Sequence, residues 1–164
     1  MRTMSMICAL VLLSGATAKS WAEGEITLSN TVQKVEYFTN ELGQTESRLI
    51  EAAQVVPGDE LAYTITFENV SEDVVVDAGS VVITNPIPPQ VVYLEGTAFG
   101  AGTTITFSAD DGSLFGSPDQ LRITNDAGEA RVADASEYTH IRWVFEPALE
   151  PGQRGSVSFR GRLR

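Results

Sequence analysis

The run Leu61-Ala62-Tyr63-Thr64-Ile65-Thr66-Phe67-Glu68-Asn69, opened by the turn Pro57-Gly58-Asp59-Glu60, decides the fold. Its apolar and polar residues alternate, which is the pattern of a β-strand with one face in the core and the other in solvent. The apolar residues that are expected to face the core are Leu61, Tyr63, Ile65 and Phe67. The run therefore predicts a half-buried strand that follows a tight turn.

The same arrangement recurs near the end of the sequence, where Pro151-Gly152 opens an alternating run over residues 156–163. Other short runs of strand-forming residues are separated by Gly, Pro, Asn and Asp. They cover residues 26–28, 32–38, 44–52, 81–84, 91–94, 104–108, 121–124 and 140–146. Many short strands, with a turn about every ten residues, predict an antiparallel β-sandwich, with a small β-barrel as the alternative.

Two connecting stretches have a predicted character of their own. Residues 39–43 separate two strand runs and are expected to form a hairpin loop, with Gly43 at the position that needs a positive φ. Residues 127–137 are rich in small and acidic residues. This second stretch is interpreted as a loop, with a single helical turn as the alternative.

The first 22 residues have the features of an export signal. Arg2 precedes an apolar run over residues 6–13, and small residues then suit cleavage after Ala18 or, preferably, after Ala22. The run is well short of the roughly 20 residues that span a bilayer, so we expect no transmembrane span after cleavage. The only cysteine, Cys8, lies in this segment, so residues 23–164 contain no thiol and form no disulfide.

Residues 23–164 are of the usual size for one domain, and we expect a single β-sandwich domain that is periplasmic, on the cell surface or secreted. The whole sequence has 11 basic and 22 acidic residues. The signal contains two of the basic residues and none of the acidic ones, so nine basic and 22 acidic residues remain, a net charge of −13. This charge argues against nucleic-acid binding and favours solubility, calcium or a basic partner.

Four motifs follow one another between residues 55 and 164. They are the turn and strand of 56–69, the strand and Pro-x-Pro turn of 82–89, the segment Tyr93-Leu94-Glu95-Gly96-Thr97, and the turn 149–152 before the last alternating strand. Together they resemble the bacterial "conserved repeat" domain of unknown function, the DUF eleven family. The resemblance implies an immunoglobulin-like β-sandwich of cell-surface and secreted bacterial proteins, often repeated in long stalks, with no established activity.

The chain departs from the stalk pattern in two ways. It carries a single copy of the motifs, and residues 23–54 precede them as an extension that is expected to add a hairpin. We therefore predict an all-β, immunoglobulin-like antiparallel β-sandwich, with residues 55–164 as its core and residues 23–54 as N-terminal extension strands.

Residues suited to catalysis are scarce. His140 is the only histidine and no Gly-x-Ser-x-Gly sequence is present, so a Ser-His-Asp triad is not indicated. Zinc needs several His or Cys ligands at close spacing, which one histidine and no cysteine after residue 22 do not supply. Lys34, the only lysine after residue 22, is a candidate for an isopeptide crosslink, but the sequence singles out no partner for it. We predict that the protein is not an enzyme, with His140 and Lys34 as surface residues.

Calcium is the one metal for which the sequence offers ligands. Asp110, Asp111 and Asp126 lie in two predicted turns, and calcium prefers clustered carboxylate and carbonyl oxygens. Ordinary turn chemistry explains the same residues, because Asp side chains accept hydrogen bonds from nearby backbone N–H groups. No cofactor is therefore predicted, and calcium remains a weak alternative.

Three arginines are candidates for an interaction surface. Arg142, Arg160 and Arg162 share one face of two strands that are expected to be neighbours, where they would form a basic strip on an acidic chain. Pairing with acidic residues on adjacent strands is the alternative.

These features predict a non-enzymatic structural or protein-interaction module of the bacterial cell envelope. It would bind a protein partner or associate with itself through surface complementarity and edge-strand pairing. A calcium- or glycan-binding module in the periplasm or outside the cell is the alternative.

Overall fold

The computed structural model describes residues 25–124 and 128–164, so the expected export signal lies outside the described residues. The described chain consists mainly of β-strands. They are β1 (Ile26–Thr39), β2 (Thr45–Glu51), β3 (Glu60–Asn69), β4 (Val81–Pro86), β5 (Val91–Tyr93), β6 (Phe99–Gly100), β7 (Thr103–Ser108), β8 (Arg122–Thr124), β9 (Ala130–Val132), β10 (His140–Phe145) and β11 (Arg154–Leu163). One 3-10 turn, η1 (Ala135–Glu137), precedes β10.

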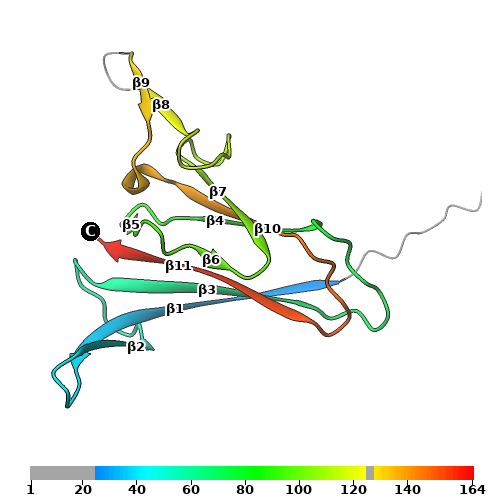
Figure 1. Cartoon of the computed structure of the whole chain (residues 1–164), viewed down its shortest axis with the longest axis horizontal. Coiled ribbons are helices and arrows are strands. Elements are labelled where there is room, and N and C mark those ends of the chain that lie inside the picture. The colour runs from blue at the N-terminus through cyan, green and yellow to red at the C-terminus, as the bar shows by residue number, and fades with distance from the viewer. Residues whose placement is uncertain (1–24, 125–127) are drawn as a thin grey trace, which may run out of the picture.

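The strands form two main antiparallel sheets, which lie one above the other in Figure 1. The larger sheet has the order β2-β1-β3-β11-β5, with β6 also paired to β11, and the smaller sheet has the order β4-β10-β7. Strands β8 and β9 pair only with each other and project from the sandwich as a separate hairpin. Neither main sheet closes on itself, so the predicted β-sandwich is confirmed and the β-barrel alternative is wrong.

One hydrophobic core lies between the two sheets. Trp143 of β10 lies 6.3 Å from Phe159 of β11, and Phe145 of β10 lies 5.2 Å from Phe67 of β3, measured between ring centroids. Strand β10 therefore lies over β3 and β11. Burying each of these aromatic side chains contributes roughly 2–3 kcal/mol to stability.

The strand that decides the fold behaves largely as its sequence predicts. Leu61, Ile65 and Phe67 of β3 are buried, and Tyr63 is half-buried at the margin of the core. Tyr63 stacks on Phe159 of the neighbouring strand, with ring centroids 4.6 Å apart. The alternation of the sequence is thus an alternation between core and solvent over most of the strand, with Ala62 of the outer face also buried.

The predicted N-terminal hairpin is present, and its first strand is longer than expected. Strand β1 has 14 residues, of which Ile26–Lys34 pair with β3 and Gln33–Thr39 pair with β2. The loop between β1 and β2 contains Gly43 at φ 77°, as predicted. One continuous strand therefore serves the sandwich with its first half and the hairpin with its second half.

The interpretation of residues 127–137 as a loop is wrong for most of its described part. Residues 130–132 form β9, which pairs with β8, and residues 135–137 form η1, which confirms the alternative of a single helical turn at that position. The Ala133 N–H donates to the Leu121 carbonyl (3.0 Å), and both of these residues are buried. Three residues, Ala130-Arg131-Val132, are too short a run for their alternation to predict a strand, so β9 depends on its pairing with β8.

The last strand lies in an unexpected place. Strand β11 pairs with β3, β5 and β6 of the larger sheet, whereas β10, which precedes it in sequence, belongs to the smaller sheet. Residues 146–153 therefore cross from one layer to the other. Strands β10 and β11 face each other across the core and are not neighbours in a sheet.

Candidate interaction surface

The two sheets differ in width, and the difference leaves part of the larger sheet uncovered. The smaller sheet has three strands, and β4 is the outermost of them on the side of β1. Strands β3 and β11 lie beneath β10, but the described residues place no strand of the smaller sheet beyond β4. Among the described residues, the inner face of β1 at residues 28–32 therefore has no strand of a second layer above it, whereas Ile26 on the same face still packs against the core.

Three side chains define this uncovered face, which we call the β1 strip: Leu28, Asn30 and Val32. Leu28 lies opposite Phe67 and Val32 lies opposite Tyr63 in the β1–β3 register. Directly opposite residues of an antiparallel pair point to the same face, so the β1 strip points toward the side of the core. Yet Leu28 is 59% exposed and Val32 is 43% exposed, whereas Phe67 is 1% exposed.

A cavity of about 200 Å³ lies beside the strip, between β1 and the end of β4. Its lining residues are Asn30, Thr31, Val32, Tyr63, Thr64, Ile65, Asn85, Pro86 and Pro88. Burial raises the pKa of the Tyr63 hydroxyl, which therefore stays neutral at physiological pH. The Asn85 side-chain amide donates to the Pro86 carbonyl (2.8 Å). The wall of the cavity is thus uncharged.

Two strand edges border the strip, one in each layer. Strand β4 pairs only with β10 among the described residues, so its opposite edge has no strand partner. Strand β2 pairs with β1 only from Gln33 onward, so the edge of residues 26–32 that faces away from β3 has no strand partner within residues 25–124 and 128–164. Such edges carry N–H and C=O groups that can pair with another chain.

The other edge of the smaller sheet is different. Phe107 of β7 exchanges two backbone hydrogen bonds with Gly116, both of 3.0 Å. This contact covers part of the β7 edge with a segment of the same chain. The β4 edge has no equivalent cover in the described part of the chain, so the sandwich is protected on one side and open on the other.

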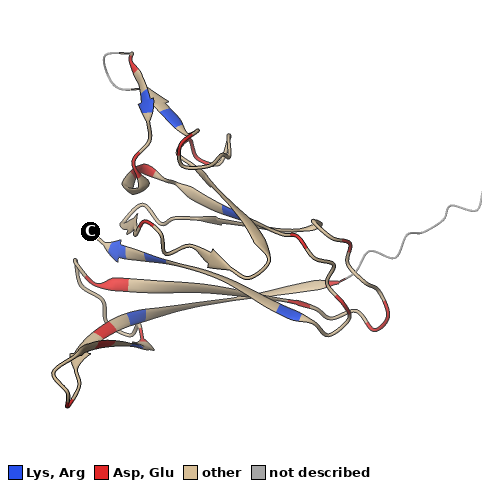
Figure 2. Ribbon diagram, viewed as in Figure 1, with Lys and Arg blue, Asp and Glu red and all other residues tan. Residues whose placement is uncertain are grey.

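The surroundings of the strip are acidic at one end. The loop between β3 and β4 carries Glu72, Asp73 and Asp77, all exposed. The loop is tied to the start of β1, because the Val70 N–H donates to the Glu25 carbonyl at 2.9 Å. Figure 2 shows acidic residues on this loop, at the end of the sandwich where β1 begins.

The three predicted arginines do not form a strip. Arg142 lies on the outer face of the smaller sheet, where its guanidinium stacks 3.5 Å from the centroid of the Phe115 ring. Arg160 and Arg162 lie on the outer face of the larger sheet, on the opposite side of the sandwich. The prediction is wrong because β10 and β11 belong to different sheets. Arg160 instead pairs with Glu60 of β3 (3.1 Å), which was the alternative interpretation.

The calcium candidates behave as turn residues where the structure describes them. The Asp110 carboxylate accepts hydrogen bonds from the Leu114 N–H (2.9 Å) and the Ser108 hydroxyl (2.7 Å), which hold its pKa below the usual value. Asp111 adopts a positive φ of 58° in the same turn. Asp126 lies outside the described residues. Within residues 25–124 and 128–164, no three His, Cys, Asp or Glu side chains are grouped to hold a metal ion.

The remaining chemical candidates also have structural partners. Lys34 forms an ion pair with Asp59 (2.7 Å), and this contact together with the Val56 N–H lowers the pKa of Asp59. An ionised carboxylate is a poor acceptor for amide formation, so the ion pair does not favour an isopeptide crosslink. His140 is half-buried, and its Nδ1 lies 3.1 Å from the Thr139 hydroxyl.

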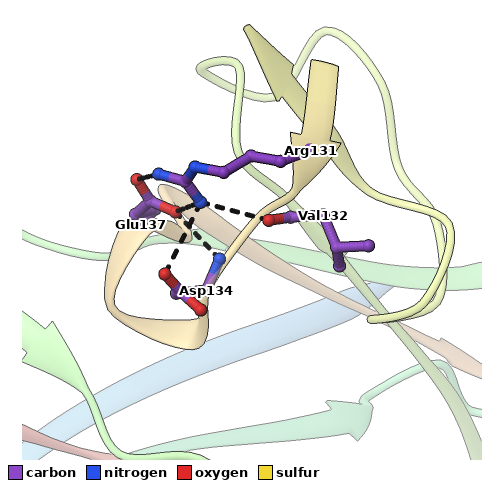
Figure 3. Close-up of polar contacts among 4 residues, drawn as sticks. All are labelled: Arg131, Val132, Asp134 and Glu137. Atoms are coloured by element: carbon purple, nitrogen blue, oxygen red, sulfur yellow. Dashed lines mark hydrogen bonds and ion pairs between the residues drawn. The ribbon is translucent and has the colours of Figure 1, made fainter. Parts of the chain in front are cut away.

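A cluster around Arg131 was not predicted, and Figure 3 shows its arrangement. The Arg131 guanidinium donates to both carboxylate oxygens of Glu137 (2.8 and 2.6 Å) and to the Val132 carbonyl (3.1 Å). Glu137 also accepts from the Asp134 N–H (2.8 Å), and these contacts lower the pKa of Glu137. The cluster fastens β9 to η1, and its polar groups are used internally.

A second apolar cavity, of about 290 Å³, lies on the far side of the sandwich from the β1 strip. Tyr93, Phe107 and Tyr138 line it, with Glu95 also present. These rings pack on one another, with centroids 4.9 Å apart for Phe107 and Tyr138, and all three residues are buried. These three residues therefore belong to the core. The β1 strip differs from them because its apolar side chains point to the core side and yet are exposed.

Comparison with known proteins adds no family to this description. No protein-family model, curated protein or solved structure matches the chain. In the part of the chain that the structure describes, no helix has the length and apolar character to cross a membrane.

Proposed function

We propose that the chain is an exported, non-enzymatic protein-interaction module of the bacterial cell envelope, and that it binds an extended strand of a protein partner. The observation that carries the proposal is the β1 strip, where Leu28 and Val32 point to the core side of the larger sheet and remain exposed. The pattern of residues 1–22 supports export. The resemblance of residues 55–164 to a family of bacterial surface and secreted proteins supports the same role.

The mechanism is addition of a strand to the smaller sheet. An extended segment beside β4 would receive hydrogen bonds from the open edge and would lie above the β1 strip. Every second side chain of that segment would point down onto Leu28 and Val32, because side chains alternate along a strand. The distance from residue 28 to residue 32 is about 13 Å at 3.3 Å per residue, so a segment of four to five residues spans it.

The register identifies the positions on β4 that would bind the segment. The Ile87 N–H donates to the Thr139 carbonyl, directly opposite in the register, so odd-numbered residues of β4 bond to β10. Even-numbered residues therefore direct their N–H groups to the open edge. Val82 is one of these residues and its side chain is 52% exposed.

Site-specific photocrosslinking in cells that express the full-length chain tests the proposal. A photoreactive phenylalanine analogue at residue 28 or 32 should yield adducts, mapped by mass spectrometry to an extended segment of a protein. The same analogue at residue 27 or 29, on the opposite face of β1 and outside the lining of the cavity, should not. Val82→Pro, which removes an edge N–H, should abolish the adducts, and Val82→Thr should retain them. Equal adducts from both faces, or adducts that survive Val82→Pro, would show that the strip is not a strand-binding site.

Export is tested separately in the same cells. N-terminal sequencing of the chain recovered outside the cytoplasm should begin at Glu23. A chain that stays in the cytoplasm with Met1 or Arg2 at its N-terminus would rule out the envelope role.

A further inference from the structure

We infer that the strand-binding partner is a second copy of this chain, turned over so that the two β1 strips face each other. The inference rests on the proposed function, because it names the occupant of the same surface. It follows from two features that lie together: the exposed apolar residues of the β1 strip, and the lack of a described strand above them in the other layer. The larger sheet extends past the smaller sheet at β1, so no described strand occupies the space above the β1 strip in the layer of the smaller sheet.

A half-turn about an axis parallel to β1, midway between the layers, exchanges the two layers. The second copy then presents its larger sheet in the layer of the first copy's smaller sheet. Its own β1 occupies the open space above the first β1 strip, and by symmetry the first β1 covers the strip of the second. A two-fold contact of this kind needs a self-complementary patch, and the strip with its neighbouring gap is such a patch.

The side chains of the strip suit this arrangement. The axis runs along β1, so each residue of the strip meets its own counterpart: Leu28 meets Leu28, and Val32 meets Val32. Packed sheets lie about 10 Å apart, which is the separation that two layers of aliphatic side chains fill. Asn30 lies between them, and two facing amides can each donate an N–H to the other's carbonyl oxygen. The contact would bury four apolar side chains and pair the polar ones.

The free edges also become paired. The uncovered edge of residues 26–32 in one copy comes to lie beside the open β4 edge of the other copy, and this happens twice by symmetry. Within one copy β1 and β4 run in the same direction. The end of β4 shares a cavity with Val32, and Val81 at its start lies opposite Phe145, whose ring packs on Phe67. Phe67 in turn lies opposite Leu28, near the start of β1. The axis preserves strand direction, so the new pairs are parallel.

The charge of the chain predicts how salt acts on this dimer. An axis parallel to the strands brings the two acidic loops, residues 70–80, to the same end of the dimer. Like charges repel and salt screens them, so added salt should tighten the dimer. A contact between arginines and acidic loops would respond in the opposite way, which separates the two modes of association in one experiment.

Light scattering and sedimentation of the exported chain, purified from cells that express the full-length sequence, test the inference. The wild-type chain should reach the mass of a dimer as its concentration rises, at lower concentration in 0.5 M than in 0.05 M sodium chloride, conditions on either side of physiological screening. The double variant Leu28→Glu/Val32→Glu should remain a monomer. The matched control is Thr27→Glu/Ser29→Glu, which adds the same charge to the same strand on the outer face, outside the lining of the cavity, and should still form dimers. Circular dichroism and thermal melting should show that both variants are folded.

Crosslinking provides the second measurement, since residues 23–164 contain no cysteine. Leu28→Cys should give a dimer with a short bis-maleimide, and Ser29→Cys should not. A wild-type chain that is monomeric at every concentration and salt, or crosslinking that is equal at both positions, would overturn the inference. Should the wild-type chain be monomeric while photocrosslinks on the strip lead to another protein, the proposed function stands and only its assignment to a second copy fails. If neither a dimer nor photocrosslinks to another protein are found, both the proposed function and the assignment to a second copy fail.

Discussion

Strands β1 and β11 flank β3 in the same sheet, and both direct every second side chain to the same side. On β11 this rule buries Val157 and Phe159, which are 0% and 1% exposed, whereas on β1 it leaves Leu28 and Val32 largely in solvent. The two strands do not differ in the kind of pattern they carry. They differ in what lies opposite, because β10 covers β11 and no described strand covers β1. Burial is thus decided across the layers, and the exposed strand is the one with room for a partner.

We expect the largest difference between the two strands in the free energy of unfolding when a side chain on the core side of each strand is truncated. Phe159→Ala should lower the free energy of unfolding by about 3–5 kcal/mol, because it removes a buried ring and leaves a cavity. Leu28→Ala should lower it by roughly 0.5 kcal/mol or less, as expected for a surface substitution. Urea unfolding, performed at a concentration at which the protein is monomeric, measures both. Comparable losses would mean that β1 is covered in the monomer.

The end of β3 sharpens the comparison. Its last residue, Asn69, is hydrogen-bonded to the segments that lead to β4 and β11. Asn69 is fully buried, and its side-chain amide donates to the carbonyls of Leu149 (2.9 Å) and Val74 (2.7 Å). Its side-chain oxygen accepts from the Ser71 N–H (3.1 Å). Asn69→Ala leaves these groups without their partner and should cost about 2–4 kcal/mol.

The Asn69 prediction is checked by chemical denaturation together with hydrogen exchange. Amides of residues 149–153 and 70–76 should lose protection before those of the β1–β2 hairpin. Uniform loss across the molecule would show that Asn69 does not favour one side.

The next substitution probes the packing on the two sides of Phe67. Leu28 of β1 and Gly155 of β11 both lie opposite Phe67, one on each side. A Cβ atom at residue 155 would lie 2.2 Å from Cζ of the Phe67 ring, so the glycine makes room for the ring. Gly155→Ala should therefore cost about 1–3 kcal/mol through displacement of the ring.

Thermal unfolding and the aromatic NMR signals of Phe67 measure this effect. Ser156→Ala, the neighbouring position on the outer face, is the matched control and should have little effect. A neutral result for Gly155→Ala would mean that Phe67 has space to move toward β1.

The smallest effect concerns the ion pair that holds β1 to the turn before β3. The hydrogen bond from Lys34, followed by that from the Val56 N–H, lowers the pKa of Asp59 below its ordinary 3.8. A lowered pKa contributes stability above the ordinary value, and this contribution is lost as the pH falls through the folded-state pKa. The free energy of unfolding should therefore decrease with acid less steeply in Asp59→Asn than in the wild type between about pH 4.5 and 2.5. If the free energy of unfolding has the same pH dependence in both proteins, the Lys34–Asp59 ion pair does not stabilise the attachment of β1.

Local patterns in the sequence predicted the strands better than their partners. The alternation of residues 61–67 predicted the core face of β3, and Gly43 predicted the hairpin turn, because both signals act within a few residues. The pairing of β11 with β3 left no such signal. Two alternating strands joined by a short link are expected to be neighbours, and the crossing of residues 146–153 between layers made the arginine strip wrong.

The β1 strip shows the same limit at the site. The alternation of Ile26, Thr27 and Leu28 predicts a strand and the face that each residue shares. This alternation does not predict the number of strands in the opposite sheet, because those strands come from other parts of the chain. The export signal and the predicted envelope role concern residues or partners outside the described chain, and they remain predictions.

The length of β1 also determines how the protein responds to mechanical force. The start of β1 and the end of β11 lie at opposite ends of the sheet, and both strands run antiparallel to β3 between them. A pull applied at residues 25 and 164 is directed along the strands, so it shears β1 and β11 against β3. The β1–β3 ladder, from Ile26 opposite Asn69 to Lys34 opposite Leu61, then bears the load as a whole instead of opening one hydrogen bond at a time. Forced unfolding is governed by the rate of unfolding and not by equilibrium stability, so the resistance along this axis depends on the ladder that must break first.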